Sequence, residues 1–247
     1  MRQQGGTRRI GMLLPSSNTV VESIITAMLG SVPGVSAHVT RLTVKEISLE
    51  SESERQFQIQ TMLDAAGLLA DARVHVMGWN GTAASWLGFE RDRGLCAMMS
   101  QRYGVPATTA VMAVNELLDE LDARRFALVT PYIDSVQCDI VSQYRQAGYE
   151  CVAERHTGEH VNFAFAEVSG EAIETMIREV AHERPAAIVV MCTNLNAAPL
   201  VARLERELDI PIVDSLAAYV WKSLRLAGVR TDTITGWGRI FQCMGAS

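Results

Sequence analysis

The sequence lacks any apolar run long enough to span a lipid bilayer. Its longest apolar runs, residues 10–15 and 186–192, fall far short of the ~20 residues that a membrane helix needs. The first residues, Met1-Arg2-Gln3-Gln4-Gly5-Gly6, also lack the apolar core of a secretion signal. We therefore expect a cytoplasmic protein that makes no membrane contact and keeps its thiols reduced.

The chain also has no excess of positive charge. Lys and Arg number 22 against 28 Asp and Glu, which gives a net charge of −6 at pH 7. This sign opposes binding to a phosphate backbone, so we do not expect nucleic acid as a partner. Hydrophobic residues make up 48% and charged residues 20%, a composition that excludes a disordered or collagen-like chain.

Metal-binding and nucleotide-binding motifs are missing as well. The five cysteines are Cys96, Cys138, Cys151, Cys192 and Cys243. They form no C-x-x-C pair, so neither a zinc site nor a disulfide framework is predicted. His156 and His160 are four residues apart, but Gly158 lies between them and no third ligand is near, so no metal is expected. Neither G-x-G-x-x-G nor G-x-x-x-x-G-K-[ST] occurs, and we expect no cofactor.

Short runs rich in Val and Ile alternate with segments of helical spacing, which indicates an α/β fold with parallel sheets. The predicted strands cover residues 10–14, 37–42, 74–78, 107–109, 126–130, 149–153, 187–191 and 211–214. The predicted helices cover residues 19–29, 53–69, 110–121, 135–146, 170–183, 198–207 and 216–226.

The second half of the sequence repeats the plan of the first. Residues 9–15 resemble residues 125–131, and both segments read as a strand that ends in Pro before a helix. The segments that follow, around Gly81 and Cys192, match in the same order. The repeat predicts two Rossmann-like lobes related by a pseudo-two-fold axis, with a cleft between them. We expect the first lobe over residues 8–115, the second over 116–228, and a segment over 229–247 that returns to the first lobe.

Ligands of open α/β sheets bind at the carboxyl ends of the strands. Four loops meet there, beginning at Pro15, Trp79, Pro131 and Cys192. The first loop, residues 15–18, joins the free N–H groups of a helix N-terminus to hydroxyl and amide donors, a combination that suits a carboxylate. Simple capping of the helix by the same residue types is the alternative.

Cys192 follows a buried strand and lies where that strand enters the expected cleft. A free thiol has a pKa of about 8.5, so it can donate a proton, or act as a thiolate after modest tuning. A buried core cysteine is the alternative. Trp79 and Trp86 flank Gly81, and they either line a pocket or fill the interface between the lobes.

Four segments together resemble one known group of proteins. They are Pro15-Ser16-Ser17-Asn18, Trp79-Asn80-Gly81-Thr82, Val129-Thr130-Pro131-Tyr132 and Met191-Cys192-Thr193-Asn194. Their order and spacing resemble the aspartate/glutamate racemase superfamily, in the branch of maleate cis-trans isomerases and arylmalonate decarboxylases, over residues 8–242. The resemblance implies two Rossmann-like lobes, an active site between them, no cofactor and a small carboxylate or dicarboxylate substrate. An oligomer of identical chains is compatible with it.

The resemblance also implies a reaction. Racemases and isomerases of the superfamily place one cysteine from each lobe across the substrate, and these positions fall on Gly81 and Cys192. Glycine at the first-lobe position and cysteine at the second-lobe position is the arrangement that resembles the decarboxylases. It implies that a malonate-type acid loses CO2 and that Cys192 protonates the resulting enediolate. Maleate isomerisation by Cys192 and a non-catalytic carboxylate-binding protein remain the alternatives.

The same resemblance implies roles for individual residues. Cys192, Thr82 and Tyr132 are the expected catalytic residues, with Thr82 and the N–H groups around Ser17, Gly81 and Thr82 stabilising an oxyanion. The expected substrate-binding residues are Pro15, Ser16, Ser17, Asn18, Gly81, Ala83, Asn162, Thr193 and Asn194. Asn194 either binds substrate or caps the next helix. Residues 46–60 are expected as a loop that covers the cleft or, alternatively, as an exposed solvated face.

Overall fold

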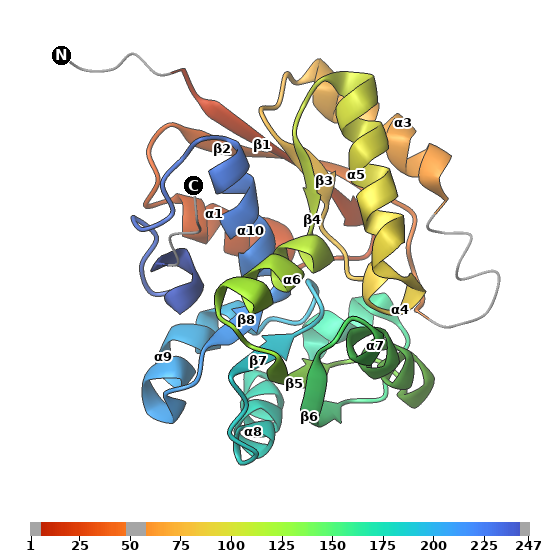
Figure 1. The fold of residues 1–247 in the computed structure, drawn as a ribbon. Helices are drawn as coiled ribbons and strands as arrows, with labels where there is room; N and C mark the ends of the chain where they lie inside the picture. The colour runs from red at the N-terminus through yellow and green to blue at the C-terminus, as the bar shows by residue number, and fades with distance from the viewer. Residues whose placement is uncertain (1–5, 48–57, 243–247) are drawn as a thin grey trace.

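The computed structural model describes residues 6–47 and 58–242 (Figure 1). Residues 48–57 of the expected covering loop and residues 243–247 of the C-terminal segment lie outside the described residues. Among the helices that are described, none combines the length and the apolar character needed to cross a membrane.

Within the described residues, eight parallel strands form two four-stranded sheets of the same design. The first sheet, in the order β2-β1-β3-β4, contains β1 (Arg8–Pro15), β2 (Val35–Leu42), β3 (Met77–Trp79) and β4 (Ala107–Thr109). The second sheet, in the order β6-β5-β7-β8, contains β5 (Arg125–Thr130), β6 (Glu150–His156), β7 (Ala187–Val190) and β8 (Ile212–Asp214). Equivalent strands occupy equivalent places, which confirms the α/β class, the predicted strands and the internal repeat.

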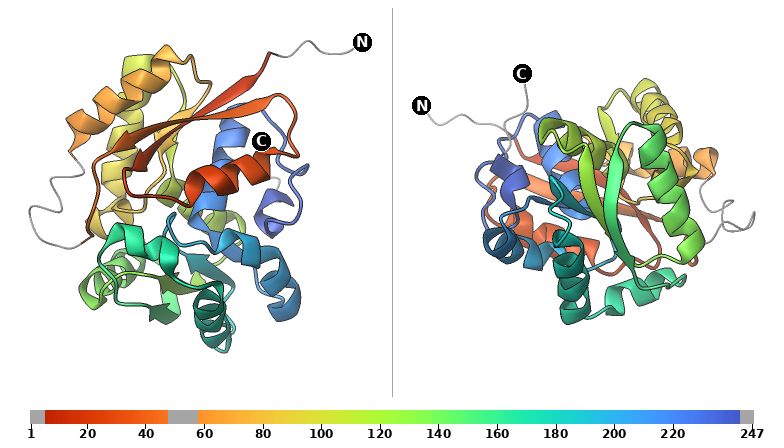
Figure 2. Two further views of the ribbon diagram at one scale, coloured as in Figure 1. Left: turned by 180° about the vertical axis from the view of Figure 1, so that it is seen from behind. Right: turned by 60° about the horizontal axis from the view of Figure 1, so that its bottom comes forward.

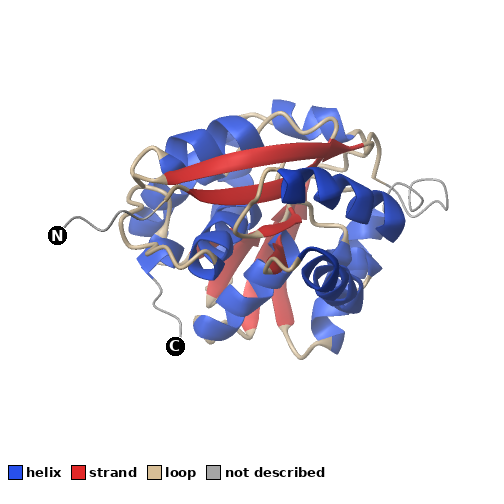
Figure 3. Ribbon diagram, turned by 90° about the horizontal axis from the view of Figure 1, so that it is seen from above, coloured by secondary structure: helices blue, strands red, loops and turns tan. Residues whose placement is uncertain are grey.

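Helices cover both faces of the strands (Figure 3). The helices of the first half are α1 (Val21–Leu29), α3 (Ile59–Asp71), α4 (Ala84–Leu87), α5 (Phe89–Tyr103) and α6 (Ala110–Glu120). The second half contributes α7 (Asp134–Gln146), α8 (Gly170–Ala181), α9 (Ala198–Leu208), α10 (Ser215–Leu226) and the 3₁₀ turns η1 (Asn162–Glu167) and η2 (Arg239–Gln242). Because helices cover both faces, strands such as β7 are apolar and buried along their whole length.

The spacing of apolar residues does not predict α4 and α5. Helix α5 buries Asp92 on the same face as apolar residues, so a charged residue interrupts the pattern by which an amphipathic helix is recognised. Cys96 lies in this helix. The helix begins after Gly88 (φ 101°) and ends at Gly104 (φ 66°), which are backbone conformations that favour glycine.

Helix α10 connects the two halves. It follows β8 of the second sheet but packs against α6 and β4 of the first half, and Figures 1 and 2 show it among the elements of that half. The Tyr219 hydroxyl donates a hydrogen bond to the Gly11 carbonyl of β1 at 2.8 Å. The described part of the C-terminal segment also contacts the second half, since the Arg239 N–H donates to Glu205 of α9 at 2.8 Å. The lobe boundaries at residues 115 and 228 stay a prediction.

Candidate active site

A buried cavity lies where the carboxyl ends of the strands of both sheets meet, and we refer to it as the site cavity. The free space inside it is narrow, about 20 Å³. Its lining residues are Pro15, Val44, Ile47, Trp79, Gly81, Thr82, Ala83, Trp86, Tyr132, Asn162, Cys192 and Thr193. The structure therefore brings together eight of the expected site residues, and none of the described lining residues carries a charged side chain. A carboxylate bound here would be held by neutral hydrogen-bond donors.

Cys192 is held as a protonated thiol at the end of β7. The strand is wholly buried, and Cys192 itself is only 3% exposed. Burial raises the pKa of the Cys192 thiol to about 12, although hydrogen bonds from the Tyr132 hydroxyl and from the N–H groups of Asn194 and Leu195 favour the thiolate. At neutral pH the sulfur therefore carries a proton to give, and three donors are ready to stabilise the thiolate that remains.

Tyr132 links Cys192 to Thr82. The Tyr132 hydroxyl and the Thr82 Oγ1 are 2.6 Å apart, and either atom can donate. The Tyr132 ring packs edge-on against Trp86 and Phe165, with centroid distances of 5.2 and 5.4 Å. Burial raises the pKa of Tyr132 well above its usual value, so its hydroxyl stays protonated. The three expected catalytic side chains thus form one fixed hydrogen-bonded chain.

The loop between β1 and α1 is held by protein contacts on several sides. The Arg41 guanidinium donates to the carbonyl oxygens of Ser16 at 3.1 Å and Asn18 at 2.9 Å. Ser17 Oγ donates to the Val44 carbonyl at 2.7 Å and accepts from Asn162 Nδ2 at 2.7 Å. Asn162 is thereby fixed at the rim of the site cavity.

The structure places the side chains of Asn18 and Asn194 outside the cavity lining. Asn18 Oδ1 accepts from the N–H groups of Val20 and Val21, both at 3.1 Å, and so caps α1. Asn194 Oδ1 accepts from the Thr19 N–H at 3.0 Å, while Asn194 Nδ2 donates to the Asn162 carbonyl at 2.6 Å. These two amides tie the first half of the chain to the second.

Three backbone N–H groups are available for an anion. In the part of the chain that the structure describes, the N–H groups of Ser17, Gly81 and Thr82 have no protein acceptor. Gly81 and Thr82 line the site cavity, and Ser17 belongs to the loop beside it. Gly81 and Thr82 are buried and Ser17 is half-buried. An unpaired buried donor is costly, so an anion would gain most from the N–H groups of Gly81 and Thr82.

Val44 and Ile47 line the site cavity but were not among the expected site residues. Both are buried and apolar, and they follow β2, the strand beside β1. Residues 44–47 also pair with the second half, because the Asn162 N–H donates to the Lys45 carbonyl and the Ile47 N–H to the His160 carbonyl, both at 2.9 Å. Val44 and Ile47 could have been predicted from the sequence only through the expected pairing of the strands at residues 10–14 and 37–42, which brings the segment after the second strand beside the loop after the first.

Asp214 is a second buried titratable group at the ends of the strands. It pairs with Val190 of β7 in the sheet and is only 1% exposed. Its Oδ1 accepts from the Ala217 N–H at 2.8 Å and caps α10, whereas its Oδ2 is buried without a hydrogen-bond partner among the described residues. Burial raises the pKa of the Asp214 carboxyl to about 7, and its negative charge in turn raises the pKa of Cys192.

The raised pKa of Asp214 should make the free energy of unfolding depend on pH. A carboxyl whose pKa is about 7 in the folded protein and 3.8 in the unfolded chain lowers the free energy of unfolding as pH rises between these values. Asp214→Asn keeps the capping oxygen and removes this titration. The free energy of unfolding of the variant, relative to that of the native chain, should rise by about 4 kcal/mol from pH 4 to pH 8. Denaturant unfolding at the two pH values measures this difference. Asp71→Asn, on the exposed surface of α3, is the control and should change stability by less than about 0.5 kcal/mol. A gain that is the same at both pH values would contradict the assignment.

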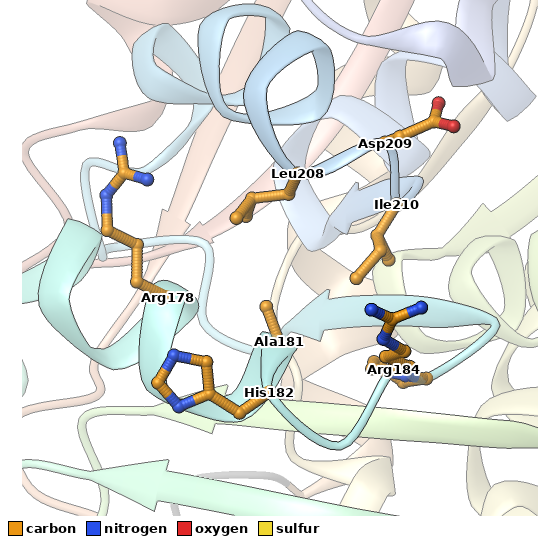
Figure 4. Close-up of a pocket in the computed structure, with 8 residues that line it drawn as sticks. Arg178, Ala181, His182, Arg184, Leu208, Asp209 and Ile210 are labelled. Atoms are coloured by element: carbon orange, nitrogen blue, oxygen red, sulfur yellow. The ribbon is translucent and has the colours of Figure 1, made fainter.

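A more open depression lies elsewhere, at the ends of α8 and α9 (Figure 4). Its lining residues are Arg178, Ala181, His182, Arg184, Pro185, Leu208, Asp209 and Ile210. Arg178 is engaged by Glu174 and Glu207, and none of the expected site residues borders this depression. Among the described residues, no group of three or more His, Cys, Asp or Glu side chains is arranged to hold a metal ion. The candidate active site is therefore the site cavity around Cys192.

Comparison with known proteins places this geometry among enzymes. A family model described as arylmalonate decarboxylase matches residues 10–241. The maleate isomerase of Nocardia farcinica (strain IFM 10152) is 28% identical over 246 residues, covering 96% of each chain. The arylmalonate decarboxylase of Bordetella bronchiseptica is 26% identical over 242 residues, covering 97% of this chain and 98% of that protein.

Solved structures agree over nearly the whole chain. A mutant of the Nocardia farcinica maleate cis-trans isomerase with a covalently bound succinylcysteine intermediate matches with a TM-score of 0.89 at 26% identity, covering 97% of this chain and 100% of the other. A double mutant of arylmalonate decarboxylase in its liganded form matches with a TM-score of 0.84 at 25% identity, covering 95% and 99%. The relatives divide between two reactions, so the choice between them rests on the residues of the site cavity.

Proposed function

The chain belongs to the arylmalonate decarboxylase family, and on that basis we propose that it decarboxylates a malonate-type dicarboxylic acid without a cofactor. The observation that carries the proposal is the pairing of one buried, protonated thiol with a glycine. Cys192 supplies the thiol, and Gly81 lines the same cavity without a side chain. Decarboxylation needs one proton donor, whereas racemisation by two bases needs a second group on the opposite face of the substrate.

The residues of the site cavity support each step of this reaction. The N–H groups of Gly81 and Thr82 and the Thr82 hydroxyl hold the carboxylate that stays on the substrate. The C–C bond to the other carboxylate breaks, CO2 leaves, and the electron pair moves into the retained carboxylate as an enediolate. Each donor that is aimed at this developing charge contributes about 3 kcal/mol to the transition state.

Cys192 then completes the reaction. Its thiol proton passes to the α-carbon, and the electron pair of the S–H bond stays on sulfur as a thiolate. Tyr132 and the N–H groups of Asn194 and Leu195 stabilise that thiolate through hydrogen bonds, and water returns the proton before the next turnover. Val44 and Ile47 offer an apolar wall to the substituent on the α-carbon.

Maleate cis-trans isomerisation is the second candidate. It is supported by the Nocardia farcinica isomerase mutant, in which a cysteine holds a covalent succinyl intermediate. Here Cys192 would have to form such a bond with an alkene alone, because Gly81 carries no thiol. The high pKa of Cys192 disfavours it, since little of the sulfur is a thiolate at neutral pH. The third candidate function is binding of a carboxylate without catalysis.

Proton NMR in D2O separates these functions. The purified protein is incubated separately with maleate, with a phenyl- or alkyl-substituted malonate and with an enantiopure arylpropionate. We expect loss of one carboxylate from the malonate and one deuterium at the α-carbon of the product. Fumarate from maleate, without turnover of any malonate, would overturn the proposal in favour of isomerisation. Binding without any turnover would favour the carboxylate-binding protein.

A further inference from the structure

Trp79 lies between the site cavity and a second cavity in the first half of the chain. The indole belongs to the last residue of β3 and is only 2% exposed. It lines the site cavity on one side, together with Ala83. On the other side both residues line a second, smaller cavity of about 10 Å³, whose other lining residues are Ile59, Met62, Ala84, Arg91, Asp92 and Leu95. Trp79 and Ala83 are thus the wall that the two cavities share.

The same indole leaves no room for a side chain at position 81. A Cβ atom added to Gly81 would lie 2.4 Å from Cζ2, 2.5 Å from Cε2 and 2.8 Å from Nε1 of Trp79. Real Cβ atoms essentially never approach other atoms below 3.0 Å. Because the ring is rigid and buried on both sides, it cannot yield as the end of a flexible side chain does. Glycine at position 81 is therefore a requirement of the packing of Trp79.

We propose that Trp79 is a specificity-determining residue, which restricts the site to a single thiol and closes the second cavity to the substrate. This inference rests on the proposed function for its consequence in catalysis, but its steric basis is independent of it. The second cavity is lined mainly by apolar side chains, and its acid, Asp92, is already engaged by Thr109. Removal of the indole would add the volume of the ring to the site cavity and join it to the second cavity, so the site would accept a larger aryl or alkyl substituent on the α-carbon.

A double-mutant cycle on stability tests the steric basis without any substrate. Gly81→Ala is made in the native chain and in a Trp79→Leu background, and thermal unfolding is measured for all four proteins. In the native background we expect the Tm to fall by about 4–10 °C, as for an overpacked core. In the Trp79→Leu background the same change should cost less than about 2 °C. Equal losses in both backgrounds would overturn the inference.

Gly94→Ala is the matched control for the cycle. Gly94 lies within α5, and an added Cβ there meets no atom within 4 Å. We expect its Tm to stay unchanged or to rise slightly in both backgrounds, because Ala is the better helix former. A loss at this position that matches the loss at Gly81 would show that the measurement does not report the contact with Trp79, and would overturn the steric reading.

Racemisation of an enantiopure arylpropionate in D2O tests the consequence for catalysis. We expect the double variant Trp79→Leu/Gly81→Cys to exchange the α-proton and lose optical purity at least about 10-fold faster than either single variant. Gly81→Cys alone should remain inactive in this assay. If Gly81→Cys alone racemises the substrate with an unchanged Tm, the inference fails. If the native chain decarboxylates no malonate but the stability cycle is non-additive, the proposed function fails and the steric basis of Trp79 stands.

Discussion

Cys192→Ala is expected to lower the turnover of the malonate-type substrate by about 10³-fold. The Kd for an unreactive dicarboxylate should stay within a few-fold of that of the native protein. The thiol is the only described cysteine that lines the site cavity. Its sulfur is protonated at neutral pH, so in the proposed reaction its loss removes the group that delivers a proton to the α-carbon. The donors that hold the carboxylate in the proposed reaction stay in place, because they belong to Gly81 and Thr82. Turnover is measured by proton NMR, and binding by calorimetry with an unreactive dicarboxylate.

Cys138→Ala is the control for this experiment. Cys138 is exposed on α7 and borders neither the site cavity nor the cavity behind Trp79. It should keep native turnover. If Cys192→Ala retained most of the activity, Cys192 would not be the proton donor. If the variant lost binding together with turnover, Cys192 would act in substrate recognition instead.

Tyr132→Phe and Thr82→Val are each expected to lower kcat by about 10²-fold, and the double variant should be little worse than either single variant. Both hydroxyls belong to one chain, in which Thr82 Oγ1 and the Tyr132 hydroxyl are 2.6 Å apart and the latter reaches the sulfur of Cys192. Removal of the Tyr132 hydroxyl breaks both links of this chain, and removal of the Thr82 hydroxyl takes away one of the two partners that orient Tyr132. Effects of groups that act as a unit are not additive.

Steady-state kinetics of the three proteins measure this coupling. Tyr149→Phe serves as the control, since its hydroxyl donates to Asp119 and takes no part in the site cavity. Independent, multiplicative losses of about 10⁴-fold in the double variant would contradict a shared hydrogen-bonded chain. Such a result would indicate that Thr82 and Tyr132 contact the substrate independently of each other.

Much of the fold could be predicted because the strands carry a strong local signal. Residues 187–190 are four consecutive apolar residues buried on both faces, and residues 125–131 repeat the plan of residues 9–15. Helix α5 could not be found in this way, since Asp92 occupies a place on its buried face. The buried Asp92 carboxylate accepts a hydrogen bond from the Thr109 hydroxyl, which lies outside the helix and is distant in sequence.

The sequence locates expected site residues in the cavity where they lie a few positions after a strand. Cys192 comes two residues after β7 and Thr82 three residues after β3, and both line the site cavity. Asn18 and Asn194 follow strands as well, but their amides are used by contacts between residues 175 positions apart in the sequence. No local pattern reveals such a contact. The close approach of Trp79 to Gly81 likewise depends on the orientation of one ring, which the order of residues does not encode.

In the proposed reaction one thiol, that of Cys192, delivers the proton from one side of the substrate. The measurement that tests it most directly is the handedness of the product formed from α-methyl-α-phenylmalonate in D2O, determined by chiral chromatography and NMR. We predict one enantiomer in large excess, with one deuterium at the α-carbon, and formation of this product about 10³-fold more slowly by Cys192→Ala. A racemic product formed by the native protein, or the same enantiomer formed at an unchanged rate by Cys192→Ala, would contradict the claim.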